Sequence, residues 1–468
     1  MTVVAYDVGV PMADGVLLRA DVYRPSSGPG PFPVLLVRTP YGKQDPTILG
    51  VLDPLRATRA GFIVAIQDVR GRFASSGSWS PVINERSDGR DSARWAAGLP
   101  GSNGRVGTYG PSYLGQVQVA NDSPLVAASV ISYTWSNPAD GLVARGGAAE
   151  VGLVTNWSLR LALDYLRRSG LSDAEVVRAL DHFDADPLSA AKVLAALEMP
   201  VVAAVPPFGP PQRPLLIIAG WYDVFLQGSL DIYHRSDTAS LIVGPWSHNN
   251  HTAQVGNRNA GLKADEGRLD LFGRQLDFLR DPPRRPEAQV FLTGVDEWRT
   301  YEKWPPPSRP HLFPVAGAFG FGPGDPVPTH GGNLLISPGF PPGPLDQARV
   351  ESRPDVLVIT GEPLTSDLEV QGRVTASIRA TGSADLVVRL CDVDPDGVSL
   401  NLTDGIFRAN GEAQREVDLW SIGHVFRAGH RIRVQITWSS FPRWDIVAHA
   451  KGPITIHPGS AVTLPNIG

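Results

Sequence analysis

Short, nearly continuous apolar runs recur through the first 280 residues and alternate with stretches of helical period. The apolar runs lie at residues 33–38, 62–66, 215–219 and 241–244, and the helical patterns at 54–60, 87–97 and 268–279. Strands that are buried on both faces have this continuous apolar character, so the pattern predicts a parallel sheet covered by helices. Alternation on either side of Asp14-Gly15 adds a β-hairpin within residues 3–24.

The pattern changes twice along the chain. Three helical segments without intervening strand runs are predicted at 156–168, 172–183 and 187–198, and a Pro-rich stretch ends this block at 205–211. Beyond residue 286 apolar and polar positions alternate cleanly at 374–378, 386–390 and 432–438, as in an antiparallel sandwich. We therefore predict an α/β core formed by 1–140 and 212–285, a helical cap at 141–211, and a jelly-roll domain at 286–468.

Composition limits the class of protein. A chain of 468 residues exceeds what one hydrophobic core usually supports, and its 42% hydrophobic and 19% charged residues are ordinary for a soluble globular protein. The net charge of -5 argues against nucleic acid or an anionic membrane as partner. No signal-like start or membrane-length apolar run is present, so a cytoplasmic location is expected. Cys391 is the single cysteine, which excludes an intrachain disulfide.

The stretch GTYGPSYLG at residues 107–115 is the strongest candidate for chemistry. It predicts a strand, a sharp turn that carries Ser112, and then a helix, which is the arrangement of the nucleophile elbow of α/β-hydrolases. The usual Gly-x-Ser-x-Gly pattern would place a glycine at position 114, where this chain has Leu114 and then Gly115. The alternative interpretation is a glycine-rich turn with a buried serine.

Acyl transfer by a serine requires a base that takes the hydroxyl proton and an acid that orients the base. Ser112, Asp223 and His248 each follow an apolar run directly, in the chain order typical of α/β-hydrolases. The carboxyl ends of parallel strands meet at one edge of a sheet, so we expect these three side chains to lie together. They are the predicted catalytic residues.

Alternatives exist for two of these positions. Asp231 is the nearest rival for the acid, but it falls in a helical stretch. His234 and His251 compete with His248 for the role of base, and His248 is closest to its strand end. His248 and His251 have a spacing that metal ligands on a helix could have, but no cysteine or carboxylate close in sequence completes a site. We therefore predict no metal and no cofactor.

Two groups are candidates for stabilising the developing oxyanion. The backbone N–H of Tyr113, the residue after the nucleophile, is one donor that the elbow supplies. The phenolic hydroxyl of Tyr41, in the loop after an early strand, is the second. The alternative for Tyr41 is that its ring only packs under the edge of the sheet.

Seven motifs together resemble the cocaine-esterase/X-prolyl dipeptidyl-peptidase (CocE/NonD) family. They are RTPYGK (38–43), QDVRGRFASSG (67–77), GPSYLG (110–115), GWYD (220–223), GPWSH (244–248), CDVDPDG (391–397) and NLTDG (401–405). The resemblance extends over nearly the whole chain, and the displaced glycine of the elbow is a feature of that family.

The resemblance implies an α/β-hydrolase core with an inserted helical cap and a C-terminal jelly roll. It also implies a Ser112–Asp223–His248 triad and a side-chain oxyanion donor at Tyr41. Positions that pack against substrate in such proteins correspond to Phe225, Trp157 and Trp221. This cap is short and poor in aromatic residues, so the substrates of the family do not transfer directly.

The sequence thus predicts a cofactor-free serine hydrolase that acts on a small-molecule carboxylic ester or amide through an acyl-enzyme. An X-Pro dipeptidyl-peptidase or an α-amino-acid ester hydrolase is the alternative within hydrolases. Such enzymes need an acidic or carbonyl anchor for a free amine, for which Glu150 is a candidate, although a surface glutamate is the simpler account. A catalytically inactive carbohydrate-binding protein is the alternative of another class. A homo-oligomer is compatible with the sequence, but nothing in it locates an interface.

Overall fold

The structure is a computed structural model, and it describes residues 2–28, 30–168, 208–320, 324–409, 414–446 and 453–468, with single positions at 172, 174 and 322. The predicted cap helices at 172–183 and 187–198 lie outside the described residues. Within the described part of the chain, no helix is both long enough and apolar enough to cross a bilayer.

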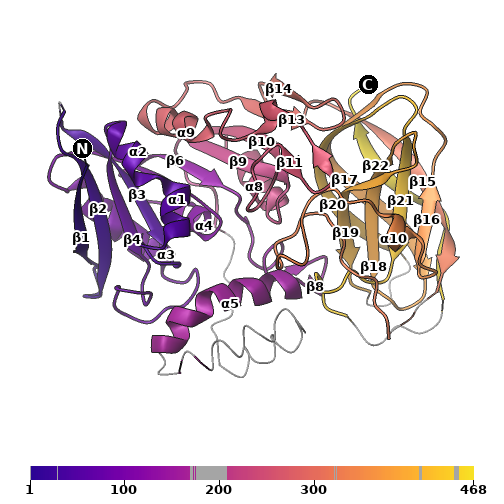
Figure 1. Ribbon diagram of the computed structural model, residues 1–468, viewed down its shortest axis with the longest axis horizontal. Coiled ribbons are helices and arrows are strands. Elements are labelled where there is room, and N and C mark those ends of the chain that lie inside the picture. The colour runs from indigo at the N-terminus through magenta and orange to yellow at the C-terminus, as the bar shows by residue number, and fades with distance from the viewer. Residues whose placement is uncertain are drawn as a thin grey trace.

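A ten-stranded sheet forms the first domain (Figure 1). In spatial order its strands are β1 (Thr2–Pro11), β2 (Leu17–Pro25), β4 (Ile63–Asp68), β3 (Phe32–Thr39), β5 (Ser102–Pro111), β6 (Val126–Ser132), β9 (Leu215–Tyr222), β10 (Ala239–Ser247), β13 (Ala288–Leu292) and β14 (Glu297–Tyr301). The strands from β4 to β13 run parallel. The predicted hairpin, β1 and β2, and the last strand, β14, pair antiparallel at the two ends.

Helices cover both faces of this sheet. On β3, Leu35 and Val37 point toward one face, where they join the core beneath α1 (Pro46–Leu52), α2 (Pro54–Arg59) and α9 (Leu271–Arg280). Val34 and Leu36 point to the opposite face, which α3 (Glu85–Ala97), α4 (Tyr113–Ala120) and α8 (Leu226–His234) cover. This two-sided burial explains the continuous apolar runs of the sequence and confirms the α/β-hydrolase fold class.

Between β6 and β9 the chain leaves the sheet. It forms a small hairpin of β7 (Ala144–Arg145) and β8 (Ala148–Ala149) and then the helix α5 (Val151–Arg168). The predicted helix at 156–168 is the second part of α5, which begins five residues earlier. In Figure 1, α5 starts beside β8 and extends away from the second domain along the outside of the first.

The second domain is an all-antiparallel β structure of two four-stranded sheets. One contains β15 (Arg309–Phe319), β22 (Ile454–Asn466), β17 (Leu368–Thr381) and β20 (Gln414–Phe426), and the other β16 (Val356–Thr360), β21 (Arg431–Thr437), β18 (Leu386–Val393) and β19 (Ser399–Phe407). Val374 and Ile378 of one sheet share a core with Val434 and Ile436 of the other, as the alternation predicted.

The boundary between the domains differs from the predicted one. β13 pairs parallel with β10, and β14 pairs with β13, so residues 288–301 extend the first sheet. The sandwich begins only with β15 at Arg309. Both strands are short and follow a Pro-rich segment, which made them resemble the β-rich remainder of the chain.

One strand of the sandwich is buried on both faces because the first domain covers it. All residues of β18 are buried, although its sequence alternates. The outward-facing Val387 packs against Ala148 of the β7–β8 hairpin and against Trp444. The next outward-facing residue, Arg389, lies opposite Asp404 of β19. The contact between the domains therefore contains charged side chains that are removed from water.

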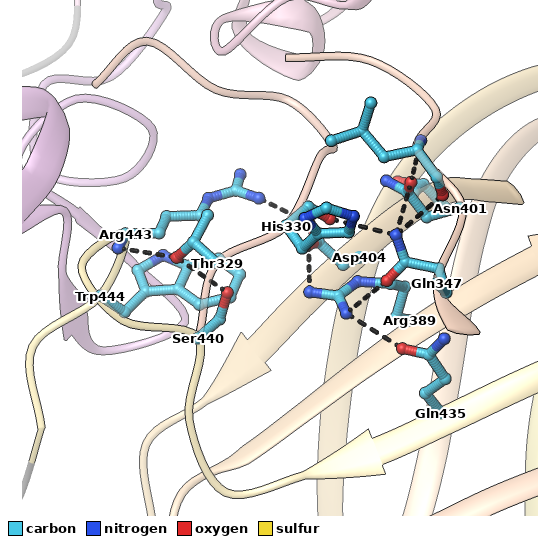
Figure 2. Close-up of polar contacts among 12 residues, drawn as sticks. Thr329, His330, Gln347, Arg389, Asn401, Asp404, Gln435, Ser440, Arg443 and Trp444 are labelled. Carbon is cyan, nitrogen blue, oxygen red and sulfur yellow. Dashed lines mark hydrogen bonds and ion pairs between the residues drawn. The ribbon is translucent and has the colours of Figure 1, made fainter. Parts of the chain in front are cut away.

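Asp404 is the centre of this buried charge cluster (Figure 2). Its carboxylate accepts a hydrogen bond of 2.7 Å from Arg443, and the guanidinium groups of Arg389 and Arg145 lie within 3.7 and 3.8 Å. Burial raises the pKa of Asp404, but the three arginines outweigh it and lower this pKa below its usual value. Arg145 also stacks on the ring of Trp420, 3.7 Å from its centroid.

Replacing this carboxylate should destabilise the second domain strongly. In Asp404→Asn, three buried guanidinium groups would face a neutral amide, so we expect urea unfolding to show a loss of about 3–5 kcal/mol. Because the folded-state pKa is lowered, the stabilisation is present above the unfolded pKa of about 4 and is lost as the pH falls through the folded value. The exposed turn variant Asp396→Asn is the control, expected within about 0.5 kcal/mol of the parent. Equal stability of the two variants would contradict the account.

Candidate active site

Strands of the first sheet deliver the predicted site residues to one edge. Tyr41 follows β3, Ser112 follows β5, Asp223 follows β9 and His248 follows β10, each at the carboxyl end of its strand. Tyr41, Ser112 and His248 line a common cavity of about 320 Å³. Its apolar wall includes Ile48, Val51 and Leu52 of α1, together with Pro111 and Leu114. The cavity is of a size that accommodates a small organic group.

Ser112 occupies the turn between β5 and α4 in a conformation that L-residues rarely adopt, with φ 60° and ψ −126°. Two hydrogen bonds hold it there. Its N–H donates to the carbonyl of Ser132 at 2.9 Å, and its carbonyl accepts from the Thr134 hydroxyl at 2.8 Å. Such a residue costs about 1–3 kcal/mol and persists only where its surroundings fix it. This backbone conformation, held by those contacts, places the half-buried side chain of Ser112 in the cavity that it lines.

The two glycines of the elbow are required by close packing. A Cβ on Gly110, whose φ is +136°, would lie 2.8 Å from Cβ of Leu114. A Cβ on Gly115 would lie 2.9 Å from Cβ of Thr134, in the segment that follows β6. The helix therefore packs closely against Ser132 and Thr134 at position 115, which accounts for a glycine there.

His248 and Asp223 form a direct hydrogen bond, with 2.7 Å between Nδ1 and Oδ1. The Asp223 side chain is fully buried and that of His248 is 7% exposed, so water competes little for this bond. A proton on Nδ1 is held by the carboxylate and leaves Nε2 as an acceptor. Phe225 packs edge-on against the imidazole, with ring centroids 5.3 Å apart. Asn333, from the segment after β15, donates to the backbone carbonyl of Asp223 at 3.0 Å.

The rival residues have other partners. Asp231 lies on α8, as predicted, and accepts a hydrogen bond from Gln227. His234 is on the same helix and stacks on Trp304. His251 is bonded to Glu266, with 2.5 Å between Nδ1 and Oε2, and stacks on Tyr133. The fold thus brings the carboxylate of Glu266, which is 15 positions away in the sequence, next to His251.

Tyr41 turns its hydroxyl toward Ser112. The ring is half-buried against the core, while the hydroxyl interacts with the Ser112 side chain and accepts a hydrogen bond of 2.9 Å from Nε1 of Trp157. Burial raises the pKa of this phenol, and the contacts with Trp157, Arg160 and Ser112 reduce that rise. Because Trp157 supplies a donor, the proton of Tyr41 is available for another acceptor.

Tyr113 contributes through its backbone. It is the first residue of α4, so no earlier turn of that helix can accept its N–H. Its side chain is held by buried contacts. The hydroxyl donates to Glu85 at 2.8 Å and accepts from the N–H of Val82. Trp157 stacks on the ring, at 6.1 Å between centroids.

The three residues predicted to contact substrate have different environments. Trp157 and Phe225 belong to one buried cluster next to Ser112 and His248, together with Trp135. Trp221 does not join them. Its indole points to the opposite side of β9, donates to the carbonyl of Phe291 at 2.6 Å and packs against Trp304 at the contact with the second domain. Ile217 and Ala219 of β9 lie in the same cluster as Trp221, so the alternation of the strand turns Trp221 to this face, and it does not line the cavity of Ser112.

Sequence reasoning missed several contributors to this site. Trp135 lies three residues after β6, whose carboxyl end meets the same edge, so the rule that located the other residues could have found it. Asn333 belongs to the second domain, and no local pattern connects it with Asp223. Arg160 of α5 lines the same cavity as Ser112 and was hidden in an ordinary helical pattern.

Comparison with known proteins agrees with this architecture. The profile of the X-Pro dipeptidyl-peptidase (S15 family) matches residues 14–250, and that of the X-Pro dipeptidyl-peptidase C-terminal non-catalytic domain matches residues 283–461. Cocaine esterase of Rhodococcus sp. (strain MB1 Bresler) is 32% identical over 546 aligned positions, covering 96% of this chain and 93% of the relative.

Solved structures share the fold across both domains. An aminopeptidase from a marine sediment Thaumarchaeota archaeon superposes with a TM-score of 0.78 at 22% identity, covering 100% of this chain and 96% of its own. An α-amino acid ester hydrolase gives 0.73 at 21% identity, with 99% and 96% covered. A CocE/NonD family hydrolase from Staphylococcus aureus gives 0.68 at 17%, with 100% and 94% covered.

The sheet order, the strained elbow and the second domain define an α/β-hydrolase with a C-terminal β-domain. The sequence matches identify the family within this class. The chain belongs to the X-Pro dipeptidyl-peptidase (S15) family, whose members include the cocaine-esterase-like CocE/NonD proteins, and it is a hydrolase.

Trp157 should act by positioning Tyr41. In Trp157→Phe the donor to the Tyr41 hydroxyl is lost, so we expect kcat to fall about 10-fold with little change in KM, because one hydrogen bond is removed. Steady-state kinetics on a chromogenic acyl substrate measures this, with circular dichroism to confirm the fold. Trp95→Phe, on the remote helix α3, is the control. A kcat equal to that of the parent would show that the Trp157 bond has no such role.

Proposed function

We propose that the protein is a serine hydrolase that cleaves carboxylic esters through an acyl-enzyme, with Ser112, His248 and Asp223 as its catalytic triad. The observation that carries this proposal is the 2.7 Å bond from His248 to the buried Asp223 at the strand edge where Ser112 projects into the same cavity as His248. Nucleophile, base and orienting acid thus come from the carboxyl ends of β5, β10 and β9, at one edge of the sheet.

Acylation follows from these positions. Oγ of Ser112 attacks the ester carbonyl and its proton passes to Nε2 of His248, while Asp223 stabilises the imidazolium. The negative charge that develops on the carbonyl oxygen accepts hydrogen bonds from the Tyr41 hydroxyl and the N–H of Tyr113. His248 then gives its proton to the leaving alkoxide, and an alcohol departs.

Deacylation repeats these steps with water as the nucleophile. His248 takes a proton from the water, and the resulting hydroxide attacks the acyl carbon of the Ser112 ester. The same oxyanion donors bind the second tetrahedral intermediate. His248 returns the proton to Oγ of Ser112, and the carboxylic acid leaves. Each side chain ends in its starting protonation state.

Glu150 is a poor anchor for a free amine. The sequence suggested a surface glutamate as the simpler account, and this prediction was wrong: Glu150 is only 2% exposed. Its carboxylate accepts from Nε1 of Trp444 at 2.9 Å and lies 3.8 Å from Arg443, inside the contact between the domains. Burial raises its pKa, partly offset by the arginines. Glu150 therefore stabilises the contact between the two domains.

The carboxylates that share a cavity with Tyr41 also have other partners. They line a cavity of about 530 Å³ beside the Ser112 cavity. Asp7 and Asp68 both contact Lys43, and Asp164 lies 3.5 Å from Arg72. Asp45 caps α1 by accepting two backbone N–H groups. Among the described residues of this cavity, each carboxylate has a partner, which favours a substrate without a free ammonium group.

An X-Pro dipeptidyl-peptidase remains the second candidate, because the S15 profile matches half of the chain. An α-amino acid ester hydrolase shares the fold at 21% identity and would need the same free amine. The 32% identity with a cocaine esterase over both domains supports the ester substrate more strongly. An inactive carbohydrate-binding protein is set aside, because the chain belongs to a hydrolase family.

A paired panel distinguishes these candidates. We expect turnover of p-nitrophenyl esters of short acyl chains and none of Ala-Pro-p-nitroanilide, and Ser112→Ala should lower kcat by roughly 10⁴ to 10⁶. The exposed Ser87→Ala is the matched control with normal turnover. Hydrolysis of the anilide that is abolished by N-acetylation would replace the ester proposal with the peptidase. Near-normal turnover by Ser112→Ala would refute both.

Tyr41 should contribute at every pH up to the strongly alkaline range. Tyr41→Phe is expected to lower kcat/KM about 10²- to 10³-fold, because one oxyanion donor is lost. The phenol donates only while protonated, and its pKa is raised above the usual value of about 10. The ratio between parent and variant should therefore stay constant from pH 6 to about pH 9.5. A ratio that falls toward one by pH 8.5 would exclude a phenol proton at this position.

A further inference from the structure

Arg160 lies where three cavities around the proposed site meet. It projects from α5 and lines the Ser112 cavity, the neighbouring 530 Å³ cavity, and a third of about 400 Å³ that shares His248 with the first. Its guanidinium carbon is 5.6 Å from the centroid of the Tyr41 ring. Tyr41 in turn contacts Ser112. The Tyr41 side chain therefore interacts with both the guanidinium of Arg160 and the nucleophile Ser112.

The charge of Arg160 is not neutralised by any described residue. The neighbouring cations all have acidic partners: Lys43 contacts Asp7 and Asp68, and Arg72 lies near Asp164. Among the described residues that line the Ser112 cavity and the 400 Å³ cavity, Arg160 is the one permanently charged side chain. The remaining walls are apolar groups, amides, hydroxyls and histidines.

A solvated arginine on an exposed helix face is the simplest alternative, and Arg160 is indeed exposed. Two observations argue against that account. The guanidinium leans over the ring of Tyr41, which restricts it to the side of the helix that faces the site. Asp164, one turn further along α5, contacts Arg72 and Arg168 and leaves Arg160 without a carboxylate.

We propose that Arg160 is a specificity residue that binds a carboxylate on the ester substrate, so that the enzyme prefers half-esters of dicarboxylic acids or esters whose alcohol carries a carboxylate. The inference rests on the proposed ester hydrolysis and names its substrate class. A planar guanidinium can donate two parallel hydrogen bonds to a carboxylate. With a neutral ester, the same guanidinium would be hydrogen-bonded only to water.

The two cavities that share Arg160 and His248 offer two places for the rest of such a substrate. The 320 Å³ cavity contains Ser112 and the apolar wall of α1. The 400 Å³ cavity has Asn156, Ser247 and the segment from Leu334 to Pro342. With the ester carbonyl at Ser112, both the cavity for the acyl chain and the cavity for the alcohol would contain Arg160. Substrates with the carboxylate on the acyl chain and substrates with it on the alcohol distinguish these two arrangements.

The test compares matched substrates on matched variants. The substrates are ethyl hydrogen glutarate (carboxylate on the acyl part), the butyrate ester of glycolic acid (carboxylate on the alcohol part), and the neutral diethyl glutarate. For the parent we expect kcat/KM on one anionic ester to exceed that on the neutral ester, and the preference to shrink in high salt. Arg160→Gln should lower the anionic value about 10-fold and change the neutral value less than about 2-fold.

Two further variants serve as controls. Arg160→Lys keeps the charge and should recover part of the anionic preference. Arg59→Gln removes an exposed arginine of α2 that lies outside all three cavities and should leave every rate unchanged. An equal fall on neutral and anionic esters in Arg160→Gln would mean that Arg160 acts through Tyr41, and it would overturn the proposal. So would unchanged values on all three esters.

Binding separates this inference from the hydrolase proposal itself. Calorimetry on Ser112→Ala should show tighter binding of the preferred anionic ester than of the neutral one, and the double variant with Arg160→Gln should lose the difference. Discrimination by Ser112→Ala together with a parent that hydrolyses none of the esters would retain the anion site and reject the proposed reaction. Hydrolysis of all three esters without discrimination in binding would reject the anion site alone.

Discussion

The backbone of Ser112 is the constraint on which the site depends. A residue at φ 60° is strained, so the free energy that keeps it there must come from neighbouring elements. Hydrogen bonds to Ser132 and Thr134 supply part of it, and the close approach of Gly115 to Thr134 keeps α4 in contact with the segment that follows β6. The buried parallel sheet, with helices on both faces, makes that contact rigid.

The second domain takes part in positioning the site although it supplies none of the proposed catalytic residues. Asn333 donates to the backbone carbonyls of Trp221 and Asp223, at 2.7 and 3.0 Å, and so fixes the loop that carries the acid. The arginines around Asp404 hold the start of the cap against β18 and β19, and α5 continues from there to Trp157 and Arg160. The domain contact and the oxyanion donor are thus joined by one helix.

Sequence patterns predicted those parts of the molecule that depend on local order. Apolar runs located the parallel strands β3, β4, β9 and β10. The glycine-rich elbow located Ser112, and it was grouped with Asp223 and His248 because the carboxyl ends of parallel strands share one edge. Contacts between distant segments left no such pattern. Trp221, two residues before the acid, was predicted to contact substrate, yet it packs against Trp304 and does not line the cavity of Ser112. Glu150 resembled a surface residue because its partners, Arg443 and Trp444, are nearly 300 positions away.

The central claim is that Ser112 is a nucleophile activated by His248. The most direct measurement is labelling of the folded protein with a fluorophosphonate, followed by peptide mass spectrometry. The account predicts one phosphonyl group per chain on the peptide that contains Ser112, at a rate that falls sharply in His248→Ala. The absence of labelling in folded protein, or labelling of another serine at the same rate in both proteins, would contradict it.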